Sequence, residues 1–214
     1  MLKGIVFDLD GTLVDSLGAT LAGFNHAITA MGSRPHTPEE IMQHFGTGED
    51  QIFSKILGRE KAQAAYDLFR TYMNDHMGKV PLHAGVQELL DQIRRDQVPT
   101  AIFTGRSWDT TEIILRHHGI LERFITVVAN DHVDFPKPSP AGLHLALTRM
   151  KLSANEVLFI GDSPADMIAS QAAGSHGVAA LWDLLADRTA LAAHQPAHWA
   201  HHPSEIWDIW KKQQ

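Results

Sequence analysis

The sequence contains no cysteine, and this absence excludes several kinds of chemistry at once. Its 214 residues can form no disulfide and offer no thiolate, either as a nucleophile or as a zinc ligand. A chain of this kind suits a reducing compartment, so we expect a cytoplasmic location. No apolar run approaches the roughly 20 residues that a membrane-spanning helix needs, so no membrane partner is expected.

Basic charge is also scarce. The chain has 18 Lys and Arg against 25 Asp and Glu, which gives a formal net charge of −7. Proteins that bind nucleic acid usually carry a basic patch or stripe, so no nucleic-acid partner is expected. Hydrophobic residues make up 44% of the chain, as in ordinary globular proteins, and the length suits one domain with an insertion or two small domains.

Five short apolar runs without charged residues are separated by amphipathic stretches. Each run has the length of a strand that is buried on both faces, as in parallel sheets. Their alternation with helices predicts an α/β fold with a Rossmann-like, doubly wound parallel sheet. The predicted strands are 4–7, 100–103, 126–129, 157–160 and 177–181. A final edge strand is expected within 197–202, after which Ser204 is expected to cap the last helix.

The connection between the first two predicted strands is much longer than the later ones. It spans about ninety residues, and helical patterns fill most of it. Asp15-Ser16 and Thr37 are expected helix caps, the latter followed by Pro38 and by Glu40 at the third helical position. We therefore predict an inserted α-helical cap domain at residues 15–80 and a core domain made of residues 1–14 and 81–214.

Polar side chains follow the predicted strands at the points where they end. Because the carboxyl ends of parallel strands share one edge of the sheet, these side chains should meet in one crevice. The first strand leads to Asp8 and Asp10, the second to Thr104, Gly105 and Arg106, the third to Lys137 further along, and the fourth to Asp162 and Asp166.

This set of groups suits phosphoryl transfer. Carboxylates gathered in one pocket repel one another unless a cation is present, and oxygen ligands of this kind suit Mg²⁺. The Thr104 hydroxyl and the Lys137 ammonium are suitable partners for phosphate oxygens. A carboxylate beside Mg²⁺ can attack phosphorus and form an aspartyl-phosphate. A second carboxylate two residues along can protonate the leaving group and then activate water.

The four motifs resemble those of the haloacid dehalogenase superfamily of phosphatases, in particular members with a helical cap after the first motif. Phosphoglycolate phosphatases and β-phosphoglucomutases are among these members. The first motif is matched by Asp8-Leu9-Asp10-Gly11-Thr12, the second by Thr104, the third by Lys137 before Pro138, and the fourth by Gly161-Asp162-Ser163-Pro164-Ala165-Asp166. Their order and spacing agree over nearly the whole chain.

The resemblance implies a role for each motif residue. Asp8 would be the nucleophile and Asp10 the general acid and base. The phosphoryl group would be bound by Thr104, the Gly105 amide and Lys137. The groups implied to hold Mg²⁺ are the Asp8 and Asp162 carboxylates and the backbone carbonyl of Asp10, with Asp166 beside the metal directly or through water.

Three features allow a second interpretation. Arg106 stands where many relatives carry Lys or Ser after an Asn, so it is either a substrate contact or a surface residue at a helix start. The segment 46–50 resembles the specificity loop of such caps but could be an ordinary turn between helices. Asp166 lies three residues after Ser163, so a capping box alone could explain it.

Four of the 14 histidines gather near the carboxyl end, at positions 194, 198, 201 and 202. Zinc ligands occur at such spacings. Three of them, at 198, 201 and 202, lie within the expected edge strand, however, and edge strands commonly carry polar groups. We therefore assign them no metal.

Together the residues and the resemblance predict a Mg²⁺-dependent phosphatase that acts on a small phosphorylated metabolite, phosphoglycolate-like, through an aspartyl-phosphate. The protein is expected to be a monomer or a homodimer. A sugar phosphomutase would share every core residue, and a non-catalytic binding protein could use the same fold. Both alternatives stay open at the level of sequence.

Overall fold

The predicted strands form one parallel sheet of six strands in the order β3-β2-β1-β4-β5-β6. The computed structural model describes residues 1–214. Its strands are β1 (Gly4–Phe7), β2 (Thr100–Phe103), β3 (Thr126–Val128), β4 (Val157–Gly161), β5 (His176–Ala180) and β6 (His198–Ala200). In the central register Phe7 lies opposite Ile102 on one side and Ile160 on the other. Because the chain order runs outward from β1 in both directions, the prediction of a doubly wound α/β sheet is confirmed.

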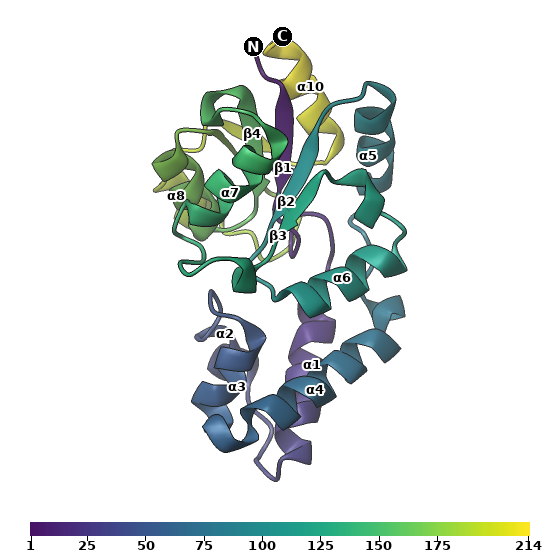
Figure 1. Ribbon diagram of the computed structural model, residues 1–214, viewed down its shortest axis with the longest axis vertical. Coiled ribbons are helices and arrows are strands. Elements are labelled where there is room, and N and C mark those ends of the chain that lie inside the picture. Colours follow the sequence, from purple (N-terminus) through teal and green to yellow (C-terminus); the bar gives the residue numbers. More distant parts are fainter.

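Alternate residues of each central strand enter different layers of the core. Ile5 and Phe7 belong to a large apolar cluster, whereas Val6 between them belongs to a second one. Helices α5 (Val86–Arg95), α6 (Trp108–His117) and α10 (Ser204–Lys212) contribute to the first cluster. Helix α7 (Ala141–Met150) and one residue of α8 (Pro164–Ala173) contribute to the second. Helices therefore cover both faces of the sheet (Figure 1), which explains why its strands are apolar throughout.

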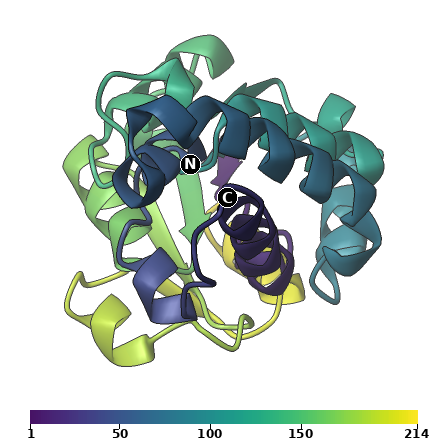
Figure 2. The same cartoon turned by 90° about the horizontal axis from the view of Figure 1, so that it is seen from below.

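The long insertion after β1 is helical, and it lies beyond the edge of the sheet at which the strands end (Figure 1). Its helices are α1 (Leu17–Ala30), α2 (Pro38–Met42), α3 (Glu49–Leu57) and α4 (Arg59–Asp75). Phe24 stacks obliquely against Phe53 and Phe69, with ring centroids 4.8 and 4.7 Å apart. Figure 2, which views the molecule from this end, shows these helices in front of the sheet. The domain boundaries at residues 15 and 80 stay a prediction.

Two of the expected helix caps form and two do not. Thr37 makes the expected capping box with Glu40, and Ser163 makes one with Asp166. The expectation that Ser16 caps α1 was wrong, because its hydroxyl donates to Asp10 instead. Ser204, expected to cap α10, is the first residue of that helix, and no side chain caps it.

Small differences in strand ends have local causes. The third strand ends at Val128 rather than Ala129, because a short 3₁₀ helix, η3 (Asn130–His132), follows directly. The edge strand is shorter than expected. It ends at Ala200, since the next backbone N–H, that of His201, donates to Glu205 Oε2 at 3.0 Å. No helix of the protein is both long and apolar enough to cross a bilayer.

The two ends of the chain lie side by side. The Gln214 side-chain amide donates to the backbone carbonyl of Leu2 at 3.1 Å. In Figure 1 both ends are at the opposite end of the molecule from helices α1 to α4.

Candidate active site

A cavity of about 540 Å³ lies between the carboxyl-end edge of the sheet and the inserted helices. Asp8, Asp10, Lys137, Asp162 and Asp166 all line it. Each comes from a segment that directly follows a strand, except Lys137, which lies in the loop between β3 and α7. The expectation that these motifs meet in one crevice therefore holds in the geometry, although their chemical roles stay a proposal.

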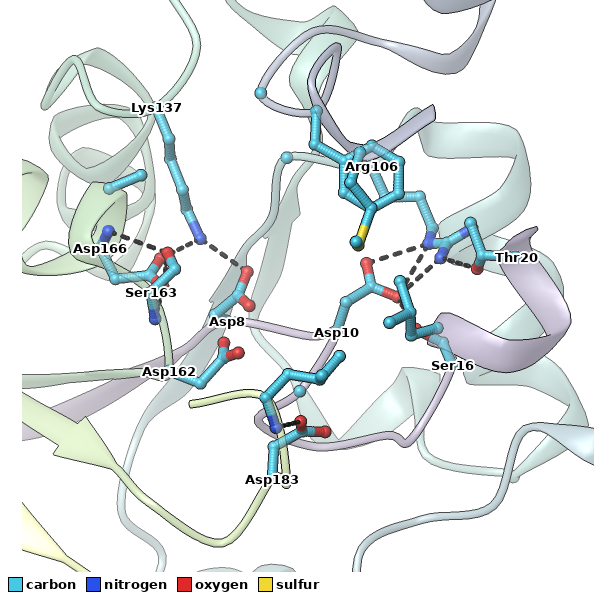
Figure 3. A pocket seen from close by; sticks show the side chains of 18 of the residues that line it. Asp8, Asp10, Ser16, Thr20, Arg106, Lys137, Asp162, Ser163, Asp166 and Asp183 are labelled. Atoms are coloured by element: carbon cyan, nitrogen blue, oxygen red, sulfur yellow. Dashed lines mark hydrogen bonds and ion pairs between the residues drawn. The ribbon is translucent and has the colours of Figure 1, made fainter. Parts of the chain in front are cut away.

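Lys137 joins two of the carboxylates. Its Nζ lies 2.6 Å from Asp8 Oδ1 and 2.5 Å from Asp166 Oδ1 (Figure 3). The side chain is buried and passes over the rings of Phe103 and Phe159, with Nζ 4.8 and 5.2 Å from the centroids. Burial favours the neutral amine, but Asp166 and Asp8 hold the pKa of Lys137 above its usual value. The lysine is thus a fixed, charged ammonium at the floor of the cavity.

Three carboxylates are close enough to share one cation. Asp8, Asp162 and Asp166 each offer an oxygen within 4.8 Å of the others. Burial raises the pKa of Asp8 to about 7, with Lys137 offsetting part of that effect and Asp166 and Asp10 adding to it. Burial, reinforced by Asp8 and Asp166, likewise raises the pKa of Asp162 well above its usual value. Lys137 alone does not compensate these charges, so the donor set fits a hard divalent cation such as Mg²⁺.

Asp166 serves the fold and the site together. Its Oδ2 accepts from the Ser163 backbone N–H at 3.1 Å and from the Ser163 hydroxyl at 2.6 Å, while Oδ1 faces Lys137. The side chain is 1% exposed. The two interpretations of this residue are therefore compatible, because one carboxylate oxygen closes the capping box and the other lies in the charged cluster.

The first and fourth motifs are brought together by a glycine. Gly11 has a φ of +74°, and a Cβ at this position would collide with the carboxylate of Asp162. Asp162 Oδ1 also accepts a hydrogen bond from the Thr12 hydroxyl at 3.3 Å. Only glycine combines the left-handed backbone with so close an approach, which explains its place in the first motif.

Asp10 lies apart from the carboxylate cluster and is held by Arg106. Arg106 Nη2 donates to Asp10 Oδ1 at 2.6 Å and Nε to Oδ2 at 3.1 Å, and the Ser16 hydroxyl also donates to Oδ1 (Figure 3). Burial favours the neutral acid, but the charge and hydrogen bonds of Arg106, aided by Ser16, hold the pKa of Asp10 below its usual value. The surface interpretation of Arg106 was wrong, since its side chain is 4% exposed and lies against the cavity. A direct contact between Arg106 and substrate stays a prediction.

Glu49 is a buried acid that the sequence did not single out. It begins α3 and is 5% exposed. Its Oε2 accepts from the Ser107 backbone N–H at 2.8 Å, and its Oε1 accepts from the Thr110 hydroxyl at 2.7 Å and lies 3.4 Å from Arg106 Nη1. Glu49 thus links the inserted helices to the segment after β2. The sequence predicts a specificity loop or an ordinary turn between helices at 46–50, and a buried contact with a distant part of the chain has no signal in the local sequence.

Of the two residues that follow β2, Gly105 lines the cavity and Thr104 is buried. Thr104 is 1% exposed, and its Oγ1 accepts from the Arg106 backbone N–H at 3.2 Å. Gly105 lines the cavity, whereas Thr104 is not among the lining residues. Their contacts to a phosphoryl group therefore stay predictions.

The histidines near the carboxyl end form no cluster with metal-binding geometry. The group of Asp8, Asp162 and Asp166 is the sole set of three or more His, Asp or Glu residues that meets that description. His202 Nδ1 instead lies 2.8 Å from the Ser204 hydroxyl.

Comparison with known proteins decides the family. A model of the family described as haloacid dehalogenase-like hydrolase matches residues 5–180. The chain belongs to this family. It is 33% identical over 190 residues to a phosphoglycolate phosphatase of Photobacterium profundum, covering 83% of this chain and 82% of that one. It is 29% identical over 209 residues to the pyrophosphatase PpaX of Bacillus velezensis, covering 97% and 96%.

The fold is shared with solved structures of haloacid dehalogenase-like proteins. One is described as a predicted phosphoglycolate phosphatase from Haemophilus somnus, with a TM-score of 0.84 at 23% identity over 97% of both chains. The prediction that this chain is an enzyme, a phosphatase of this family, is thereby confirmed by its relatives. The match also includes the inserted helices, because residues 5–180 contain them.

Proposed function

We propose that this haloacid dehalogenase-like phosphatase hydrolyses a small phosphomonoester with Mg²⁺ as its cofactor and Asp8 as its nucleophile. The observation that carries the proposal is the placement of Asp8. Its carboxylate lies in the cavity between Lys137, 2.6 Å away, and the two further acids that could share a cation with it. Phosphoryl transfer requires such positioning of a nucleophile and neutralisation of charge, and little further chemistry.

The residues that would hold Mg²⁺ are the carboxylates of Asp8, Asp162 and Asp166, together with the backbone carbonyl of Asp10. When bound, the ion supplies positive charge that offsets these carboxylates and the oxygens of the phosphoryl group. Lys137 would supply a second fixed positive charge beside Asp8. Thr104 and the Gly105 amide would orient the phosphoryl group.

The reaction would proceed in two displacements. In the first, a carboxylate oxygen of Asp8 forms a bond to phosphorus as the bond to the ester oxygen breaks, and Asp10 gives its proton to the departing oxygen. In the second, Asp10 takes a proton from water as the water oxygen attacks phosphorus. The bond between Asp8 and phosphorus then breaks, which releases inorganic phosphate and restores both carboxyl groups. Arg106 favours the carboxylate form of Asp10, which the second step needs, whereas the first step needs the protonated form that Arg106 disfavours.

The substitution Asp8→Asn tests the proposal, with Asp134→Asn as a matched control on an exposed residue outside the cavity. We expect Asp8→Asn to lower Mg²⁺-dependent hydrolysis of phenyl phosphate by roughly a thousandfold or more. The control should keep its activity, and both variants should keep the circular dichroism spectrum of the parent. Substantial Mg²⁺-dependent turnover by Asp8→Asn would show that Asp8 is not the nucleophile.

The two alternatives from sequence have their own tests. Incubation with a hexose 1-phosphate that yields a 6-phosphate rather than free phosphate would indicate a sugar phosphomutase. Failure to hydrolyse any member of a broad panel of phosphate esters with Mg²⁺ would indicate a binding protein. Neither is favoured by a particular contact in the structure.

A further inference from the structure

The basic side chains that line the cavity all contact carboxylates. Two basic side chains line it, Lys137 and Arg106, and no histidine does. Lys137 contacts Asp8 and Asp166, whereas Arg106 contacts Asp10 and lies near Glu49. Six carboxylates also line the cavity, those of Asp8, Asp10, Glu49, Asp162, Asp166 and Asp183. The basic side chains that line the cavity therefore leave no unpaired positive charge for a second anionic group. Outside the lining residues, Lys55 Nζ donates to the Oγ1 of the lining residue Thr47 at 3.4 Å.

The rest of the cavity wall is largely apolar. Its larger apolar side chains come mainly from the inserted helices and the loop after α2, and they are Leu17, Phe24, Met42, Phe45 and Ile52, joined by Leu185 from the segment after β5. Phe45 is 42% exposed and Leu185 is 60% exposed, although both are large apolar residues. Exposed apolar surface beside a polar floor is typical of a ligand site.

A hydrogen bond to a carboxylate of the cavity floor fixes the position of Leu185. Its backbone N–H donates to Asp183 Oδ1 at 2.7 Å, and Asp183 lies near Asp162 on the charged floor of the cavity (Figure 3). Phe45 faces the cavity from the inserted helices, and its ring centroid lies 6.4 Å from that of Phe24. Apolar groups thus enclose the space next to the charged floor from both parts of the chain.

From this arrangement, and resting on the function proposed above, we propose that the preferred substrates are phosphomonoesters of an uncharged alcohol that carries a bulky apolar group. A second carboxylate or phosphate on the substrate would enter a cavity rich in carboxylates whose basic lining side chains are already paired, and unpaired charge is strongly disfavoured there. A volume of about 540 Å³ also suits a body larger than two carbons. Phosphoglycolate and pyrophosphate are therefore expected to be poor substrates.

Two matched pairs of esters test the inference, with kcat/KM measured at saturating Mg²⁺. Phenyl phosphate and 4-carboxyphenyl phosphate share a ring and differ in one carboxylate. Ethyl phosphate and phosphoglycolate share a two-carbon chain and differ in the same way. We expect the member without the carboxylate to be favoured by roughly tenfold or more in each pair. Equal values within each pair, or a preference for the carboxylates, would overturn the inference and leave the phosphatase function intact.

The apolar wall is tested with a pair of neighbouring leucines. Leu185 lines the cavity, whereas Leu184 is fully exposed and does not. We expect Leu185→Ser to lower the ratio of kcat/KM for phenyl over ethyl phosphate by roughly three- to tenfold. Leu184→Ser should leave this ratio unchanged, and an unchanged ratio in both variants would contradict the role of the wall. If no ester of the set is hydrolysed with Mg²⁺, the proposed function itself is refuted, and the inference with it.

Discussion

The contact of Glu49 with the segment after β2 predicts an unusually large loss of stability from one substitution in the inserted helices. In Glu49→Ala the buried Ser107 N–H loses its acceptor and Arg106 loses one of its two carboxylates. An unpaired buried N–H costs about 1–3 kcal/mol. Breaking a buried charge contact raises the expected total to about 3–5 kcal/mol. For a chain of this size the melting temperature should fall by roughly 6–20 °C.

The assay is urea-induced unfolding followed by the fluorescence of the five tryptophans. Glu49→Gln keeps the size and one acceptor oxygen, so we expect it to lose only about 1–2 kcal/mol. Glu60→Ala, on the exposed surface of α4, is the control and should stay within about 0.5 kcal/mol of the parent. An unfolding free energy of Glu49→Ala within about 1 kcal/mol of the parent would refute the reasoning, because the buried contacts would then contribute almost nothing.

Two further predictions concern the acidic cluster and its glycine. Since burial raises the folded-state pKa of Asp8 to about 7, this carboxyl group holds its proton more tightly in the folded metal-free protein than in the unfolded chain, and its contribution to stability should be lost as the pH rises from about 4 to about 7. Thermal unfolding with and without Mg²⁺ checks this, and stabilisation by Mg²⁺ that does not grow over that range would count against it. Gly11→Ala should abolish most of the activity because its Cβ collides with Asp162, whereas Gly18→Ala, in helix α1 with open space around it, should retain activity and be slightly more stable.

The sheet and its catalytic edge could be predicted because their signals are local. A run such as residues 4–7 is apolar without interruption because both faces of the strand are covered, and Asp8 directly follows it. The order of strands then fixes which loops meet, so the approach of Lys137 to Asp8 follows from topology although 129 residues separate them. Spacing along the chain was sufficient for this part of the site.

The arrangement around Asp10 could not be predicted, because it depends on how the inserted helices sit on the sheet. Ser16 carries the signature of a helix cap, yet its hydroxyl finds Asp10, a stronger acceptor, on the adjacent loop. Arg106 has the sequence position of an exposed residue at a helix start and is buried by Glu49 and Thr20. Local secondary-structure propensity does not predict such contacts, since the two partners of each contact lie in different parts of the chain.

The hydrogen bond between Gln214 and Leu2 has a practical consequence for the study of this enzyme. Because both ends emerge together on the side away from the cavity, tags, fluorescent proteins or surface attachments at either end would leave access to the cavity free. Because the two termini are close together, a short linker could join them, and a circular permutant with new termini in an exposed loop could be made. The enzyme could thus be attached to a surface through either terminus while the cavity stays open to substrate.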